Sequence, residues 1–126
     1  MTYRSRRDSV PVERVLRGTG QRSLRSIQGG PVLVTVEFTV APERQASFLE
    51  AMDQLRGSRL RTGATRWELY RDGEQANRFV EIFSVPSWEE HLRQHAGRLT
   101  EMDRAVEEAA LAFSDPPAQA DHLLPP

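Results

Sequence analysis

Two histidines stand four residues apart, His91 and His95, in a segment with helical character. On a helix this spacing puts both imidazoles on one face, where a neutral ring can accept a phenolic proton or anchor a polar ligand. The same spacing can chelate a metal, but no glutamate follows His91 as in the zinc-protease motif, and the nearest further candidate is His122. We therefore expect no metal site. The alternatives to a catalytic or anchoring role are a surface histidine and a hydrogen-bonded core histidine.

A flat ligand pocket would need aromatic walls, since such sites are mostly apolar with few polar groups. The candidate wall residues are Trp67, Phe79, Phe83 and Trp88. Ordinary core packing is the alternative for each of them.

Glu81 is unusual because it alternates with apolar residues, Phe79, Phe83 and Val85. If it faces a closed pocket, loss of solvation would suit it to act as a general base. A water-filled or interface position is the alternative. Arg66 could bind an anionic group of a ligand or pair with a glutamate across the sheet.

The acidic residues Asp103, Glu107 and Glu108 look like the solvated face of a helix. The apolar side of that helix would then be formed by Met102, Val106, Ala109, Ala110 and Phe113.

These residues must be positioned by strands and helices that the hydrophobic pattern indicates. Residues 31–40, 64–71, 78–85 and 119–124 alternate or are rich in β-branched and aromatic residues, which predicts four strands, the last at a sheet edge. Residues 42–61 have the period of an amphipathic helix with Phe48, Leu49, Met52, Leu55 and Leu60 on its apolar stripe. Ser87 and Thr100 are suitable N-caps for two further helices.

The order β-α-β-β-α-(α)-β predicts an α+β, ferredoxin-like domain, a four-stranded antiparallel sheet with helices on one face. Leu33, Val80 and Ile82 would then lie on the other face. An exposed apolar face of this kind usually marks an interface, so we expect a homodimer, sheet against sheet.

The composition narrows the possible chemistry. The chain has 126 residues, which suits one domain, and it has no cysteine, which excludes disulfides and thiolate catalysis. All 17 basic residues are arginine, so a Schiff-base lysine is impossible. We interpret the lack of lysine as a GC-rich coding bias, typical of actinobacteria.

The chain is expected to have three parts, of which the first is set apart by its charge. Residues 1–30 carry seven arginines against Asp8 and Glu13 and are expected to form a flexible basic arm. Residues 31–124 would be the folded domain, and 125–126 a tail. The arm could contact nucleic acid or an anionic membrane, but it has no nucleic-acid-reading motif, and we expect no nucleic-acid partner. No apolar run is long enough to span a bilayer and no secretory signal is evident, so a cytoplasmic location is the simplest expectation.

Several segments resemble a known family. The strand of residues 31–40 with APER at 41–44, RWELYRD at 66–72, RFVE at 78–81 and SWEEHLRQH at 87–95 resemble the antibiotic biosynthesis monooxygenases, which are dimeric α+β barrels. They are still more similar to the soluble C-terminal domain of bacterial major-facilitator exporters of the transmembrane secretion effector type.

The resemblance implies a dimer with a pocket in each subunit between sheet and helices. In the family's enzymes, phenols or quinols are oxidised by O2 without metal or flavin, so no cofactor is implied. Close relatives bind and degrade haem through a histidine of the helix, for which either His91 or His95 is the counterpart. Val85 stands where the family often has tryptophan, and Trp88 is a candidate replacement.

Two functional hypotheses follow. The domain is either a cofactor-independent monooxygenase acting on a small aromatic metabolite or a non-catalytic module that binds a ligand or partner. Haem binding is a third possibility.

Overall fold

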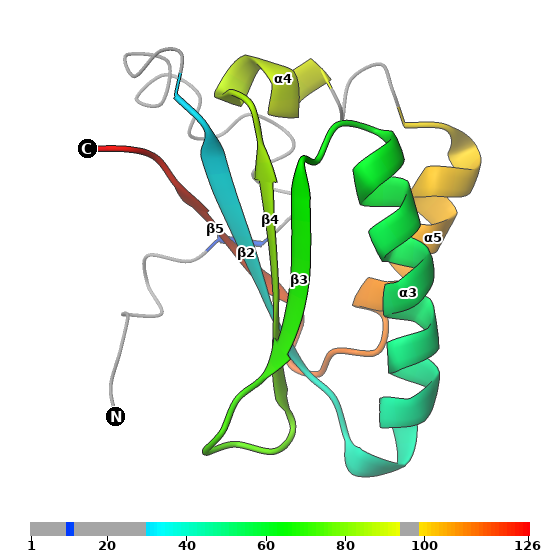
Figure 1. Cartoon of the computed structure of the whole chain (residues 1–126). Helices are drawn as coiled ribbons and strands as arrows, with labels where there is room; N and C mark the ends of the chain where they lie inside the picture. Colours follow the sequence, from blue (N-terminus) through cyan, green and yellow to red (C-terminus); the bar gives the residue numbers. More distant parts are fainter. Residues whose placement is uncertain (1–9, 12–29, 94–98) are drawn as a thin grey trace.

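The computed structural model describes residues 10–11, 30–93 and 99–126 (Figure 1). Its elements in chain order are β1 (Val10–Pro11), β2 (Val32–Thr39), the short 3-10 helix η2 (Pro42–Arg44), α3 (Gln45–Arg61), β3 (Arg66–Arg71), β4 (Arg78–Val85), α4 (Trp88–Arg93), α5 (Glu101–Leu111) and β5 (Gln119–Leu123). All strand pairs are antiparallel, in the order β1-β5-β2-β4-β3. The predicted ferredoxin-like α+β fold is therefore confirmed.

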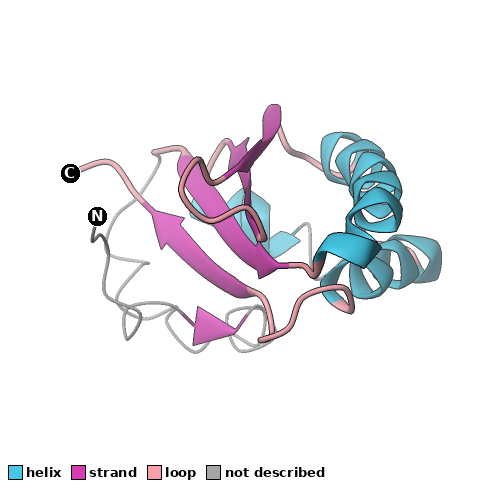
Figure 2. Ribbon diagram, turned by 90° about the horizontal axis from the view of Figure 1, so that it is seen from below, coloured by secondary structure: helices cyan, strands magenta, loops and turns pink. Residues whose placement is uncertain are grey.

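Helices α3 and α5 lie together against one face of the sheet, and α4 lies at one end of the strands (Figures 1 and 2). The core between these layers contains a cluster of phenylalanines. Phe48 of α3 contacts Phe38 and Phe79 of the sheet, each with ring centroids 5.1 Å apart, and Phe113 at 6.0 Å. This cluster fixes α3 on the sheet.

Local sequence signals explain where α3 begins and ends. Pro42 sits in the first turn of η2, where its missing N–H leaves no hydrogen bond unmade. Gly63 follows the last turn of α3 with a φ of 135°, a conformation that glycine adopts without strain. Leu49 and Leu60, expected on the apolar stripe, are exposed, because the buried stripe continues instead through Ser58 and Arg59.

The strand register decides which side chains share the helix-covered face. One row across the sheet runs Trp67, Phe83, Val34 and His122, because directly paired residues point to the same side. The neighbouring row contains Glu81 and Val36. Residues from β3, β4 and β5 that could do chemistry are thus brought onto one face.

The other face, here called the outer face, carries the side chains that alternate with these. It contains Leu33, Thr35, Glu37, Glu68, Tyr70, Val80, Ile82, Asp121 and Leu123. The predicted placement of Leu33, Val80 and Ile82 on one face is confirmed, and all three are half-buried. No helix in the described ranges lies over this face (Figure 1).

β1 is an element that the pattern did not predict. Val10 pairs with Ala120 and Pro11 with Gln119, so two residues of the expected N-terminal arm join the sheet beside β5. β5 is therefore not the edge strand along these two positions. The rest of the arm up to residue 29 lies outside the described residues.

Candidate functional site

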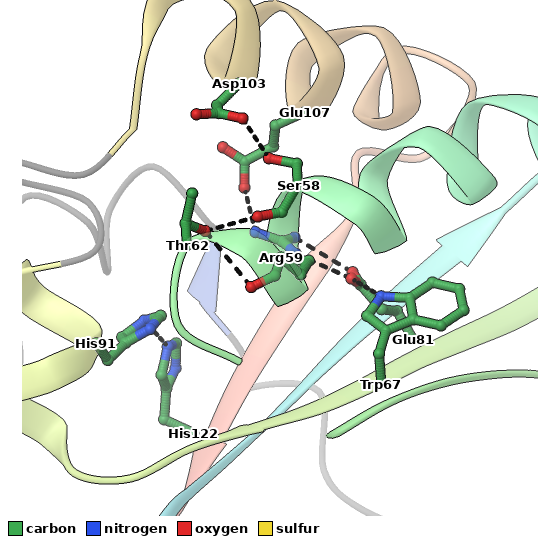
Figure 3. Close-up of polar contacts among 9 residues, drawn as sticks. All are labelled: Ser58, Arg59, Thr62, Trp67, Glu81, His91, Asp103, Glu107 and His122. Atoms are coloured by element: carbon green, nitrogen blue, oxygen red, sulfur yellow. Dashed lines mark hydrogen bonds and ion pairs between the residues drawn. The ribbon is translucent and has the colours of Figure 1, made fainter. Parts of the chain in front are cut away.

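A buried guanidinium, Arg59, connects three elements on the helix-covered side of the sheet (Figure 3). It lies four residues after Leu55 on the buried stripe of α3 and is 6% exposed. Its Nε donates to Glu81 Oε2 at 3.0 Å and a second nitrogen donates to Glu81 Oε1 at 3.3 Å. Its third nitrogen donates to Glu107 Oε2 at 2.9 Å. Arg59 thus ties α3 to both β4 and α5.

Glu81 is fully buried, and both of its oxygens accept hydrogen bonds. Besides Arg59, the indole Nε1 of half-buried Trp67 donates to Glu81 Oε2 at 2.8 Å. The structure therefore places Glu81 and Trp67, a predicted base and a predicted wall, in one hydrogen-bonded network. Both oxygens of this carboxylate are therefore engaged by donors inside the protein.

The expected solvated face of α5 is wrong for two of its three acidic residues. Asp103 and Glu107 are buried, Glu108 is exposed, and Met102, expected in the core, is 70% exposed. The helix is rotated about its axis relative to the prediction because Asp103 and Glu107 find polar partners on α3. Burying these carboxylates is tolerated only with such partners.

Asp103 has a dense set of these partners. Its backbone N–H donates to Thr100 Oγ1, and its carboxylate accepts from the Thr100 N–H at 2.9 Å, which together form a capping box. The carboxylate also accepts from the Ser58 hydroxyl at 2.8 Å and from Arg61.

The ionisation of this network follows from its contacts. Burial would lower the pKa of Arg59, but the carboxylates of Glu81 and Glu107 outweigh it and raise the pKa. Burial by itself would raise the pKa of Asp103, but hydrogen bonds from Thr100, Ser58 and Arg61 outweigh this effect and lower the pKa to about 2. Both groups are therefore charged at neutral pH.

A second polar group is a pair of imidazoles at the α4 end of the sheet (Figure 3). His91 of α4 and His122 of β5 approach each other with their Nε2 atoms 3.2 Å apart. His91 is 2% exposed, and burial lowers the pKa of His122 to about 4. His122 is therefore neutral at neutral pH, and a hydrogen bond between the two rings needs one nitrogen as donor and the other as acceptor.

Two aromatic rings, those of Trp88 and Phe83, lie beside the imidazole pair. The Trp88 ring centroid lies 5.4 Å from His91 and 5.2 Å from His122. The centroid of the Phe83 ring lies 6.4 Å from that of His91 and 4.5 Å from the guanidinium carbon of Arg59. Phe83 therefore links the imidazole pair to the Arg59 network.

The other predicted site residues lie elsewhere. Phe79 belongs to the phenylalanine cluster of the core. Arg66 forms an exposed ion pair with Glu68 at 3.1 Å. His95 lies outside the described residues, so its prediction stays untested. Within the described ranges, no three metal-ligating side chains are grouped.

His122 and Arg59 are the residues of the site that the sequence reasoning did not assign. His122 stands two positions after buried Ala120, so a strand at 119–124 already implies that the two side chains share a face. Arg59 continues the four-three-four spacing of Phe48, Met52 and Leu55. Both signals were present in the sequence, but neither residue type is expected in a core.

A hollow of about 360 Å³ lies away from these groups. It is lined by Glu37, Thr39, Pro116, Pro117 and Gln119. None of the predicted site residues contributes to it. None of the helices in the described ranges is long and apolar enough to cross a membrane.

Solved structures with this fold include several antibiotic biosynthesis monooxygenase-like proteins. One from Nitrosomonas europaea has a TM-score of 0.66 at 15% identity, over 79% of this chain and 93% of that chain. One from Caulobacter crescentus has a TM-score of 0.66 at 17% identity, over 81% and 95%. SnoaB, a cofactor-independent oxygenase from Streptomyces nogalater, has a TM-score of 0.60 at 22% identity, over 76% and 91%. At these identities the likeness establishes the fold.

Curated protein sequences gave no match. The sequence pattern of one family, described as Transmembrane secretion effector, matches residues 7–124. Because this match covers nearly the whole chain, the protein belongs to the Transmembrane secretion effector family.

Proposed function

We propose that this domain binds a small aromatic molecule of the phenol or quinol type beside His91 and His122 and oxidises it with O2 without a cofactor. The observation that supports this most directly is the approach of the two Nε2 atoms to 3.2 Å, beside Trp88 and Phe83. A neutral imidazole in such surroundings is a suitable acceptor for a phenolic proton.

The proposed reaction needs only the substrate and oxygen. For an anthrone, the enol form loses its phenolic proton to an imidazole, and the resulting anion supplies electrons to O2. Overall the ring CH2 and O2 become C=O and H2O, so the carbon loses the four electrons that the two oxygen atoms gain. One oxygen atom stays on the carbon as the carbonyl oxygen. The other leaves as water with the proton that the imidazolium returns and the remaining hydrogen of the CH2 carbon.

Oxygen uptake with anthrone tests this proposal. We expect the H91A/H122A double variant to have at least about a hundredfold lower activity, because this is the low end of the effect of a general base. M102A, which alters an exposed residue of α5, is the matched control. H95A tests the third histidine separately. Uptake no faster than in buffer, or uptake unchanged in a folded double variant, would contradict the proposal.

A non-catalytic binding module is the second candidate. One observation in its favour is that both oxygens of Glu81 already accept hydrogen bonds, so this carboxylate is not free to act as a base. The match to the Transmembrane secretion effector family is the other. Aromatic ligands that bind in calorimetry but cause no oxygen uptake would support this candidate over the first.

We also propose that two copies associate through the outer face and that the domain works in the cytoplasm. The outer face carries half-buried Leu33, Val80 and Ile82 together with exposed Tyr70 and Leu123. A second sheet placed over these side chains would bury them and close a barrel between the two subunits.

A further inference from the structure

Trp88 stands at the beginning of α4 and is only 5% exposed. Its Nε1 is buried and has no hydrogen-bond partner among the described residues. The other tryptophan of the chain is different, because Trp67 Nε1 donates to Glu81 at 2.8 Å. Buried polar groups are nearly always paired, so an unpaired donor in a native structure needs an explanation.

The surroundings of this N–H indicate what could satisfy it. The Trp88 ring contacts both imidazoles of the proposed site, tilted against His91 and edge-on to His122. The facing Nε2 atoms of the two imidazoles interact with each other. The donor therefore belongs to the same cluster as the proposed catalytic group but is not used by it.

The chemistry of the indole N–H restricts the partner to an acceptor. An indole nitrogen donates one hydrogen bond and accepts none. A carboxylate would be a costly partner, because the aromatic rings and a neutral His122 offer no positive charge to compensate its burial. A carbonyl or hydroxyl oxygen on a planar ring is both an acceptor and uncharged, and the ring can pack against the aromatic side chains.

We infer that the Trp88 N–H donates a hydrogen bond to a keto or hydroxyl oxygen of the ligand and thereby selects oxygen-bearing aromatics over their oxygen-free analogues. The inference rests on the proposed ligand site at His91 and His122. It assigns Trp88 a binding role in addition to that of an aromatic wall.

A matched pair of ligands tests the inference. We would measure the Kd values of 1-naphthol and naphthalene by calorimetry without oxygen, so that no turnover occurs. The W88F variant keeps an aromatic ring but lacks the N–H. We expect the ratio of the naphthalene Kd to the 1-naphthol Kd to fall by about threefold to tenfold in W88F, the effect of one hydrogen bond.

W67F is the control, because it also removes an indole N–H, but one that already has an internal acceptor. The Kd ratio should be unchanged in this variant. An unchanged ratio in folded W88F would overturn the inference. If W88F does not fold, the indole proton resonance of Trp88 in the wild-type protein decides: a downfield shift with 1-naphthol but not with naphthalene supports the inference, and equal shifts overturn it.

The outcome is separable from that of the proposed oxygenase activity. A Trp88-dependent preference without oxygen uptake would uphold the inference and contradict the catalytic proposal. Oxygen uptake with an unchanged Kd ratio would do the reverse. Binding of neither ligand by the wild-type protein would overturn both the inference and the proposed aromatic site.

Discussion

Arg59 and Glu81 form a two-point ion pair inside the protein, with N···O distances of 3.0 and 3.3 Å. Their side chains are 7% and 0% exposed. Arg59 comes from the last turn of α3 and Glu81 from the middle of β4, so the pair fixes the end of the helix on the sheet.

Removing the cation should be strongly destabilising. We expect R59M to lower the free energy of unfolding by about 3–5 kcal/mol, because it leaves the carboxylates of Glu81 and Glu107 buried without a countercharge. Urea denaturation measures this change. As a control, R66M breaks an exposed pair and should change stability by no more than about 1 kcal/mol. Equal effects of the two variants would contradict the structural role of Arg59.

Asp103 should make stability fall in acid. Its pKa is lowered from 3.8 to about 2 in the folded state, so its stabilisation is complete above pH 3.8 and is lost as the pH falls towards 2. We expect D103N to flatten the decrease of the melting temperature between pH 4 and pH 2. E108Q, a change at an exposed position on the same helix, should retain the wild-type decrease. Parallel curves for D103N and the wild type would rule out this assignment.

His122 should contribute a separate pH dependence at higher pH. Burial lowers the pKa of His122 from 6.5 to about 4. Between these pH values the unfolded chain binds a proton at His122 that the folded protein does not, so the free energy of unfolding decreases as the pH falls from 6.5 towards 4. H122F retains an aromatic ring beside Trp88 but cannot titrate. Its stability should fall less steeply than that of the wild type across this window, as measured by urea unfolding at several pH values. The same slope in both proteins would refute the expectation.

The outer face offers a direct test of the proposed dimer. I82E places a charge in the middle of this face, and we expect it to convert a micromolar dimer into a monomer in sedimentation equilibrium. M102E adds the same charge to α5, where the side chain is 70% exposed, and should remain dimeric. A wild-type protein that sediments as a monomer would remove the basis of the proposed barrel.

Alternation and turn signals were sufficient to predict the sheet. The strand at 78–85 agrees with β4 at both ends, and Glu81 was correctly expected on the same face as Phe79 and Phe83. Period-two patterns predict faces well because a strand has only two of them.

The polar part of the interior was harder to predict. Arg59, Asp103 and Glu107 are charged residue types that a pattern of apolar residues does not place in a core. Their burial is favourable because Arg59 pairs with Glu107 and Asp103 accepts a hydrogen bond from Ser58. Such contacts join residues more than 40 positions apart, a relationship that a local window does not contain. The rotation of α5 and the partner of Glu81 therefore required the three-dimensional structure.

The hydrogen bonds of Arg59, which connect α3 with β4 and α5, have a consequence for how the domain unfolds. If α5 detached, Arg59 would lose its hydrogen bond to Glu107 and would keep only its pair with Glu81, at a site that water could then enter. Each segment is thus satisfied only when the other two are in place. The charges at positions 59, 81 and 107 couple distant stretches of chain, so helix loss and sheet opening are expected as one cooperative event.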